Sequence, residues 1–308
     1  MKLLVTGAWR ATADDLQSLR EKGHEVLLQP QEKAPLICPY EMVDGVICKG
    51  LFLYHPIERF VNLRYIQLAS AGFDRVPMDY VTEHRIEIHN ARGVYSAPMA
   101  EFAMAGVLQL YKQTAFFREN QRRHCWLKHR ELQELTDKTV LILGCGSVGT
   151  ECARRFQAFG CRVIGIDIAV RKDEHFQAIF PLTGLDDLMP QADILILTLP
   201  LTNETRGLLN DSRLALLKPG SILVNIARGA VVDQTALLKF LPLLGGAILD
   251  VFDEEPLPED SPLWEAPNVL ITPHNSFVGD QVPQRLSRVI LQNLAAWSGH
   301  AEAGQGDH

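Results

Sequence analysis

The sequence predicts an α/β fold in which two doubly wound parallel sheets form two domains. Short apolar runs alternate with amphipathic stretches along the chain, as in repeated βαβ units. The alternation is interrupted once, from residue 99 to about residue 130, by apolar residues at helical spacing. The chain has 308 residues, and about 150 residues per domain is the usual expectation. Together these observations favour two α/β domains over one.

The first series of strands occupies the first 97 residues. Residues 12–22 are amphipathic and end beside Gly23, which predicts a helix between the first two strands. Gly7 is the only glycine in the turn after the first strand, so this domain lacks a glycine-rich phosphate loop. The strands expected here are 2–6, 25–29, 43–48, 65–69 and 86–89.

The second series of strands follows one or two long helices between residues 99 and about 130. A final helix over residues 280–298 comes after the last strand and can pack back onto the first domain. We therefore expect one domain of residues 1–97 plus 276–308 and an inserted domain of residues 98–275. The elements expected in the inserted domain are a helix at 147–159 and strands at 139–143, 161–167, 193–197, 221–226, 247–250 and 269–272.

The composition is that of an ordinary globular protein, with 47% hydrophobic and 22% charged residues. The net charge of −7 repels nucleic acid and anionic membrane surfaces, so we expect neither as a partner. No run approaches the roughly 18 uninterrupted apolar residues of a membrane-spanning helix. The six cysteines form neither a CxxC pair nor a metal-ligand spacing. We expect a cytoplasmic protein with reduced cysteines and no bound metal.

A glycine-rich motif, Gly-Cys-Gly-Ser-Val-Gly, joins strand 139–143 to helix 147–159. In this context Gly144 permits a tight turn and Gly146 lets the backbone approach a pyrophosphate. Gly149 lets the helix pack closely on the strand, and the anion lies at the helix N-terminus. The motif therefore predicts a Rossmann domain. The residues expected to contact the cofactor here are Gly144, Gly146, Ser147, Val148 and Gly149.

An acidic residue, Asp167, ends the next predicted strand, 18 residues after Gly149. A carboxylate at this place accepts hydrogen bonds from the adenosine ribose and repels a 2′-phosphate, so NAD is favoured over NADP. Arg171 and Lys172 follow closely and soften that exclusion. Within the glycine motif, Cys145 is expected to fill space.

Three charged or titratable residues, Arg228, Glu255 and His274, each follow a different predicted strand of the second domain. They are expected at the carboxyl edge of the sheet, where open α/β sheets bind ligands. A cation there can hold a carboxylate and polarise a carbonyl, and an imidazole can protonate the developing alkoxide. A neighbouring carboxylate keeps that imidazole protonated. With a nicotinamide, this set suits hydride transfer to C2 of a small 2-oxo acid.

Motifs along nearly the whole chain are similar to those of the D-isomer-specific 2-hydroxyacid dehydrogenases, the family that includes phosphoglycerate dehydrogenase, D-lactate dehydrogenase and glyoxylate/hydroxypyruvate reductase. The resemblance implies a flavodoxin-like substrate domain into which the Rossmann domain is inserted, NAD as cofactor and D-isomer specificity. The motifs lie at 70–74 (Ser-Ala-Gly-Phe-Asp), 100–102 (Ala-Glu-Phe), 200–205 (Pro-Leu-Thr-Asn-Glu-Thr), 223–233, 249–258 and 267–275.

The resemblance also implies catalytic roles. Arg228 would bind the substrate carboxylate and carbonyl, a geometry that suits the guanidinium fork. His274 would donate the proton in reduction and accept it in oxidation. Glu255 would hydrogen-bond His274 and favour its charged form.

Further roles concern cofactor and substrate binding. The backbone N–H groups of Ala71 and Gly72 would hold the substrate carboxylate, and Lys49 would add positive charge nearby. Besides the glycine motif, cofactor contacts are expected from Asp167, Leu199, Pro200, Thr205, Ala227, Arg228 and Asp250. The side chains expected to shape the substrate pocket are Trp9, Phe52, Tyr54, Phe73, Tyr95, Met99 and Phe277.

Other functions are compatible with the fold. A non-enzymatic NADH-sensing regulator can share these residues, but the sequence offers no partner-binding extension. A formate-dehydrogenase-like enzyme would carry Gln where Glu255 stands, so Glu255 counts against it. A homodimer through the cofactor domain is also expected, because many apolar residues follow Pro98. They are Phe102, Met104, Val107, Leu108, Leu110, Phe116 and Phe117.

Overall fold

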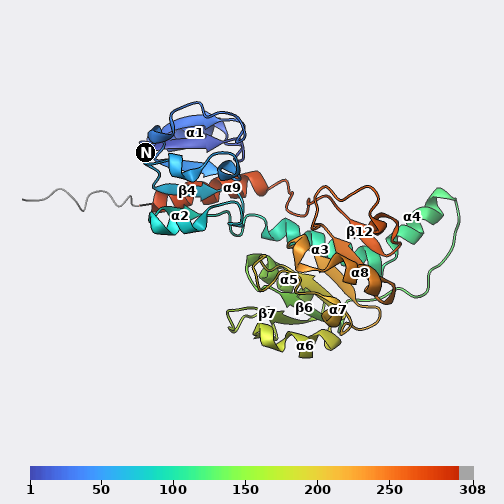
Figure 1. Ribbon diagram of the computed structural model, residues 1–308. Helices are drawn as coiled ribbons and strands as arrows, with labels where there is room; N and C mark the ends of the chain where they lie inside the picture. The colour runs from blue at the N-terminus through green and yellow to red at the C-terminus, as the bar shows by residue number, and fades with distance from the viewer. Residues whose placement is uncertain (298–308) are drawn as a thin grey trace, which may run out of the picture. The chain divides into compact units, whose positions relative to one another are not determined.

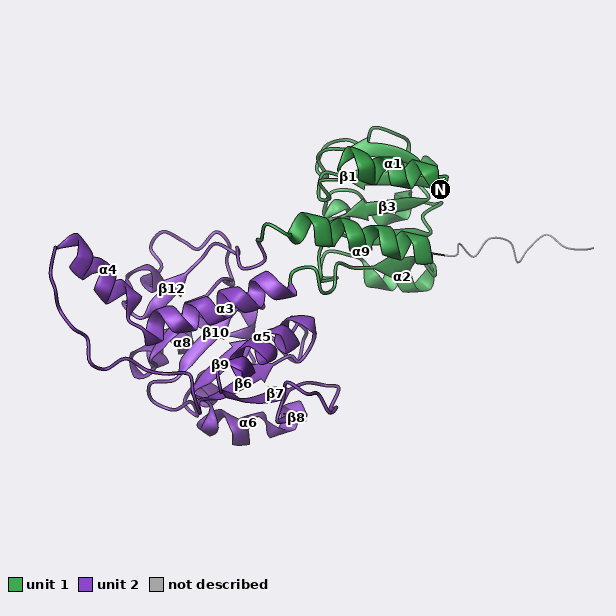
Figure 2. Ribbon diagram, turned by 180° about the vertical axis from the view of Figure 1, so that it is seen from behind, with its two compact units in different colours: residues 1–95, 279–308 green, residues 96–278 purple. Residues whose placement is uncertain are grey.

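The computed structural model describes residues 1–297, which divide between two compact units (Figure 2). Unit 1 comprises residues 1–95 and the segment from residue 279 onward, and unit 2 comprises residues 96–278. Residues 298–308, the end of the predicted 276–308 segment, lie outside the described residues. Over residues 1–297, no helix combines the length and apolar character needed to cross a membrane.

Unit 1 contains a five-stranded parallel sheet in the order β2-β1-β3-β4-β5 (Figure 1). The strand order reverses between β1 and β3, and a sheet of this kind binds ligands at the carboxyl ends beside such a point. Every residue of β3 and β4 is buried, as expected for central parallel strands covered on both faces. The strands are β1 (Lys2–Thr6), β2 (Glu25–Gln29), β3 (Gly45–Cys48), β4 (Tyr65–Leu68) and β5 (Glu87–His89).

The helices of unit 1 are α1 (Ala13–Glu21), α2 (Met78–Glu83) and α9 (Val282–Ala296). α9 comes from the end of the chain and packs on the sheet through Leu286, Ile290 and Leu294. Ser287 of α9 accepts a hydrogen bond from Trp9 Nε1 at 3.0 Å. Trp9 is therefore a buried part of the core of unit 1, and its expected contribution to the substrate pocket stays a prediction.

Unit 2 contains a seven-stranded parallel sheet in the order β12-β11-β10-β9-β6-β7-β8. The order reverses between β6 and β9, as in a Rossmann domain. The predicted fold class, with two doubly wound parallel sheets, is confirmed. β8, a three-residue edge strand, was not among the predicted strands. The strands are β6 (Thr139–Leu143), β7 (Arg162–Ile166), β8 (Ala178–Phe180), β9 (Ile194–Leu197), β10 (Ile222–Asn225), β11 (Gly246–Leu249) and β12 (Val269–Ile271).

Helix α3 (Ser96–Tyr111) packs against α5 and the neighbouring strand β11. A Cβ on Gly106 would lie 2.8 Å from the Ile248 side chain, so the glycine permits this close approach. Met104 and Val107 are buried in the core of unit 2. Much of the apolar surface predicted to form an interface is thus covered within the unit. The other helices are α4 (Thr114–Arg122), α5 (Ser147–Ala158), α6 (Leu185–Leu188), α7 (Asp211–Leu214) and α8 (Gln234–Phe240).

The long helical region expected up to about residue 130 ends at Arg122. His124 adopts a left-handed φ of 53°, and Cys125 N donates to Asn120 O at 2.8 Å, which closes the helix with a Schellman-type turn. Residues 123–135 contain no regular helix or strand. We call residues 114–135 the arm, because α4 and this segment extend away from the rest of unit 2 (Figures 1 and 2).

Candidate active site

The turn after β10 presents Arg228. Asn225 shapes this turn, because its Oδ1 accepts from Ala227 N at 3.1 Å and its Nδ2 donates to Arg228 O at 3.0 Å. A Cβ on Gly229 would lie 1.8 Å from the backbone carbon of Phe252. Glycine is therefore required after Arg228, because the turn packs directly against the backbone that leads to Glu255.

His274 and Glu255 form the pair that the sequence predicted. His274 Nδ1 lies 2.8 Å from Glu255 Oε2, and Phe252 N donates to Glu255 Oε1 at 3.1 Å. The side chains of His274 and Glu255 remain 37% and 38% exposed. Because the carboxylate engages Nδ1, Nε2 is the ring nitrogen left for proton transfer with a substrate.

Asp250 holds the loop that carries His274. Its side chain is completely buried directly after β11. Oδ1 accepts from Thr272 Oγ1 at 2.6 Å and Asn275 N at 2.7 Å, and Oδ2 accepts from Ser276 N at 3.0 Å. Asp250 O also accepts from His274 N at 2.8 Å, and His274 itself has a left-handed φ of 51°. The Asp250 carboxylate is thus engaged within the protein, and its expected contact with the cofactor stays a prediction.

The glycine loop between β6 and α5 has the local geometry that a dinucleotide requires. A Cβ on Gly144 would lie 2.6 Å from Leu199 N, and one on Gly149 would lie 2.0 Å from Gly144 O. Gly146 faces open space, and no side chain caps the first turn of α5 that follows it. Unpaired N–H groups at a helix N-terminus favour an anion, so the loop fits a pyrophosphate.

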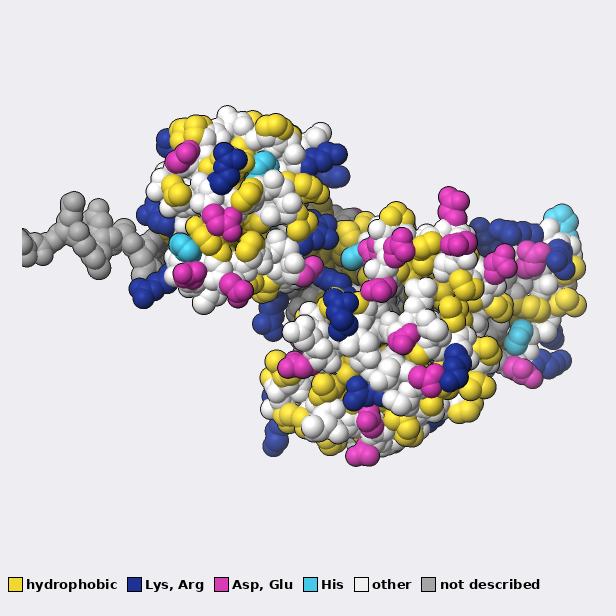
Figure 3. Space-filling model, viewed as in Figure 1, with side chains coloured by type: hydrophobic (Ala, Val, Ile, Leu, Met, Phe, Trp, Pro, Cys, Tyr) yellow, Lys and Arg dark blue, Asp and Glu magenta, His cyan; other side chains and the backbone are white. Residues whose placement is uncertain are grey.

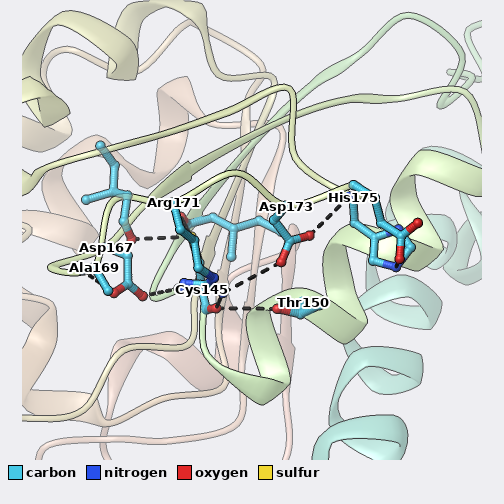
Figure 4. Close-up of polar contacts among 10 residues, drawn as sticks. Cys145, Thr150, Asp167, Ala169, Arg171, Asp173 and His175 are labelled. Carbon is cyan, nitrogen blue, oxygen red and sulfur yellow. Dashed lines mark hydrogen bonds and ion pairs between the residues drawn. The ribbon is translucent and has the colours of Figure 1, made fainter.

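Asp167, just after β7, lies against this loop (Figure 4). Its Oδ2 accepts from Cys145 N at 2.6 Å, and its Oδ1 accepts from Ala169 N at 2.9 Å. Arg171 Nη2 donates to Cys145 O at 2.5 Å, with Asp173 3.7 Å from the same guanidinium. The carboxylate expected at the ribose is therefore fixed in place, and a cation contacts the same loop.

The side chain of Cys145, a residue of the glycine loop, is buried, and its Sγ is directed to Ile166 O at 3.6 Å. Burial and the Asp167 carboxylate raise the pKa of the Cys145 thiol to about 12. The thiol stays protonated near neutral pH, which agrees with its expected role as a space-filling side chain.

The segment after β9 lies beside the glycine loop. Leu199 is buried, and its N is one of the atoms that restrict Gly144. Thr205 Oγ1 donates to Pro200 O at 2.8 Å and closes the turn. Ala227, after β10, is also buried.

The substrate-binding candidates of unit 1 follow β3 and β4. Lys49 is exposed directly after β3. Ala71 and Gly72 follow β4, and within residues 1–297 no acceptor receives a hydrogen bond from their N–H groups. Asn90 Nδ2 donates to Ala71 O at 2.6 Å and fixes the turn. Glu32 contacts the Lys49 backbone, and no motif in the sequence pointed to it.

Comparisons with known proteins find relatives of this chain by sequence and by structure. Residues 104–276 match the family described as D-isomer specific 2-hydroxyacid dehydrogenase, NAD binding domain. A glyoxylate reductase from Thermofilum pendens is 34% identical over 288 residues, which cover 89% of this chain and 84% of that protein.

Solved structures are similar over almost the whole chain. A D-isomer specific 2-hydroxyacid dehydrogenase from Xanthobacter autotrophicus Py2, in complex with NADPH and MES, has a TM-score of 0.79 at 29% identity, covering 99% of this chain and 98% of that chain. The D-lactate dehydrogenase from Aquifex aeolicus, complexed with NAD and lactic acid, has a TM-score of 0.76 at 25% identity, covering 96% and 95%.

The chain belongs to the D-isomer specific 2-hydroxyacid dehydrogenase family. It is an NAD-dependent oxidoreductase that acts on 2-hydroxy acids, and the predicted family, enzyme class and cofactor are confirmed. These similarities favour neither the NADH-sensing regulator nor the formate-dehydrogenase-like alternative.

Proposed function

We propose that the chain reduces a small 2-oxo acid such as glyoxylate with NADH, and oxidises the corresponding D-2-hydroxy acid in reverse. The observation that carries this proposal is the pair of His274 and Glu255, 2.8 Å apart, in the same unit as Arg228 and the glycine loop. The glyoxylate reductase from Thermofilum pendens, 34% identical, supports a small substrate.

In the proposed mechanism, each side chain has one task. NADH supplies the hydride that C2 accepts. Arg228 binds the carboxylate and withdraws electron density from the carbonyl. His274 Nε2 donates its proton to the carbonyl oxygen, so that the product is a neutral hydroxyl group. Glu255 stabilises the imidazolium before that transfer.

Four further residues support these steps, namely Asp250, Ala71, Gly72 and Lys49. We propose that Asp250 acts on the reaction by holding the His274 loop. The N–H groups of Ala71 and Gly72 supply donors for the substrate carboxylate, and Lys49 adds positive charge in unit 1. Two N–H donors without an acceptor at the carboxyl end of a parallel strand suit an anion.

The test of this function is turnover of a panel of 2-oxo acids with NADH. We expect reduction of glyoxylate and of other small 2-oxo acids by the purified chain. Absence of turnover on the whole panel, with NADH still bound, would contradict the proposal and favour an NADH-sensing regulator. Oxidation of formate without any 2-oxo acid reduction would favour the formate-dehydrogenase-like alternative.

The residues that we propose for cofactor binding are Gly144, Gly146, Ser147, Val148, Gly149, Asp167, Leu199, Pro200, Thr205, Ala227, Arg228 and Asp250. Among these, Asp167 sets the preference for NAD over NADP. Its carboxylate accepts from the ribose hydroxyls and repels a 2′-phosphate.

Asp167→Ala is therefore expected to weaken NADH binding and strengthen NADPH binding. The ratio of the Kd for NADPH to the Kd for NADH, measured by nucleotide fluorescence, should fall about tenfold or more. A tenfold change corresponds to about 1.4 kcal/mol of binding free energy. Asp173→Ala, at a second carboxylate near Arg171, serves as the matched control. An unchanged ratio in Asp167→Ala would contradict the role of Asp167.

We also propose a homodimer formed through unit 2. Trp126 in the arm is 96% exposed, and Phe117, Leu127 and Leu132 are exposed as well. Residues 114–135 carry five Arg or Lys against three Glu, in a chain of net charge −7, so the arm is complementary to the rest of a second copy. Figure 3 shows dark blue, cyan and magenta side chains beside yellow apolar ones at the α4 end of unit 2.

Trp126→Ser is expected to dissociate this dimer, because an aromatic side chain at the centre of an interface contributes strongly to association. Sedimentation velocity at micromolar concentration should give a dimer for the parent and a monomer for Trp126→Ser. Trp264→Ser, at another exposed tryptophan of unit 2, should remain dimeric. A monomeric parent would refute the proposed dimer.

We propose that the protein works in the cytoplasm. All six cysteines are free thiols, and four of them, Cys48, Cys145, Cys152 and Cys161, are buried. A reducing compartment suits such a protein.

A further inference from the structure

We propose that Glu32 is a positioning residue for substrate binding, which acts by fixing the backbone of the turn that carries Lys49. Glu32 lies in the connection between β2 and β3 and is half-buried. The inference rests on the proposed function, in which Lys49 contributes to binding of the anionic substrate.

The Glu32 carboxylate joins the ends of two neighbouring strands. Oε1 accepts from Thr6 Oγ1 at 2.8 Å, at the end of β1, and from Lys49 N at 2.7 Å, after β3. Oε2 accepts from Gly50 N at 2.8 Å. One carboxylate therefore satisfies two consecutive backbone donors, which would otherwise be free to turn with the loop. Hydrogen bonds to an ionised acceptor are the stronger kind in proteins.

The backbone of Glu32 is held in turn by a buried histidine. His55 Nε2 donates to Glu32 O at 2.8 Å, and Tyr40 OH donates to His55 Nδ1 at 2.9 Å. His55 is almost fully buried, and the Arg59 guanidinium lies 3.8 Å from the centre of the Tyr40 ring. Because both the main chain and the side chain of Glu32 are anchored, the carboxylate is a fixed acceptor for the turn.

This arrangement lies at the point where unit 1 is expected to bind a ligand. β1 and β3 are adjacent, and the strand order of the sheet reverses between them. A carboxylate on the first N–H groups after β3 sets the direction in which the exposed Lys49 side chain leaves the sheet. Loss of that anchor lets the turn adopt several orientations, so substrate binding must then order it.

The test is a double-mutant cycle with Glu32→Gln and Lys49→Ala, assayed with glyoxylate and NADH. The amide of Gln has one acceptor oxygen and presents a donor to the turn, so at least one of the three donors loses its partner. We expect KM for glyoxylate to rise about tenfold in Glu32→Gln, with kcat and the Kd for NADH unchanged. In the Lys49→Ala background, Glu32→Gln should raise KM by less than about twofold. Glu58→Gln, at an exposed carboxylate of unit 1, is the control.

Two results for KM would overturn the positioning role of Glu32. An unchanged KM in Glu32→Gln overturns the positioning role, as does a full tenfold effect of Glu32→Gln that persists without Lys49. If Lys49→Ala alone leaves KM unchanged, the proposed function of Lys49 fails, while turnover of glyoxylate still tests the overall function separately. If Glu32→Gln does not fold, Glu32→Asp replaces it, because the shorter carboxylate keeps the charge but cannot reach all three donors; the same criteria apply.

Discussion

Replacing His274 with alanine is expected to lower kcat for 2-oxo acid reduction about 10²–10⁴-fold, the usual contribution of a general acid. The alanine removes the proton donor from the end of β12 and leaves Glu255 without its partner at 2.8 Å. The glycine loop and Asp167 lie at the ends of other strands, so the Kd for NADH should stay within about twofold of that of the parent.

Steady-state kinetics and a fluorescence titration with NADH measure these two quantities. His84→Ala, at an exposed histidine of unit 1, is a suitable control and should keep full activity. A kcat in His274→Ala within threefold of the parent value would remove His274 from the mechanism.

Replacing Asp250 with asparagine is expected to lower both stability and activity. The amide places a donor against Asn275 N or Ser276 N, so at least one buried N–H group loses its acceptor. A buried polar group without a partner costs about 1–3 kcal/mol in the free energy of unfolding. The loop shifts, and a displacement of about 1 Å at a catalytic group reduces the rate about 10²-fold.

The measurements are thermal unfolding and kcat, made on Asp250→Asn and on Asp253→Asn. The comparison separates the loss of the buried hydrogen bond from a general loss of charge. Asp253 is an exposed carboxylate three residues later, and its variant should behave as the parent. Full activity and an unchanged midpoint of unfolding in Asp250→Asn would mean that the carboxylate does not hold the loop.

Much of this fold could be predicted from local patterns. The strands of both sheets are short apolar runs, and the glycine motif has the spacing that the turn before α5 requires. β8 was missed because three residues at a sheet edge carry too little pattern. The end of α4 was missed because His124, and not glycine, adopts the left-handed conformation that closes it.

The candidate site was predictable where its residues follow strands. Arg228, Glu255 and His274 each come just after a strand, so the parallel sheet determined their common edge. Long-range hydrogen bonds were not predictable in this way. Asp250 bonds residues 22 to 26 positions later, and Glu32 bonds residues 17 and 18 positions later.

The extent of the exposed apolar surface was overestimated. The prediction placed Met104 and Val107 in a dimer interface because the segment that forms α3 is apolar on several faces. In the structure α3 is covered by α5 and by strands of the sheet, so these faces belong to the core of unit 2. Within residues 96–135 the exposed large apolar residues are Phe117, which was among the predicted interface residues, and Trp126, Leu127 and Leu132. The last three lie in the irregular segment after α4, which has no periodic pattern to reveal them.

The role of Glu255 in proton transfer is tested by the pH dependence of reduction in Glu255→Gln and in the parent. Glutamine keeps the shape and a hydrogen bond to His274 but removes the negative charge that stabilises the imidazolium. The protonated form, which reduction requires, is then lost at lower pH. We expect the alkaline limb of the kcat/KM profile to lie at lower pH in Glu255→Gln than in the parent. Coincident profiles would contradict this mechanism, because Glu255 would then have no influence on the proton that His274 donates.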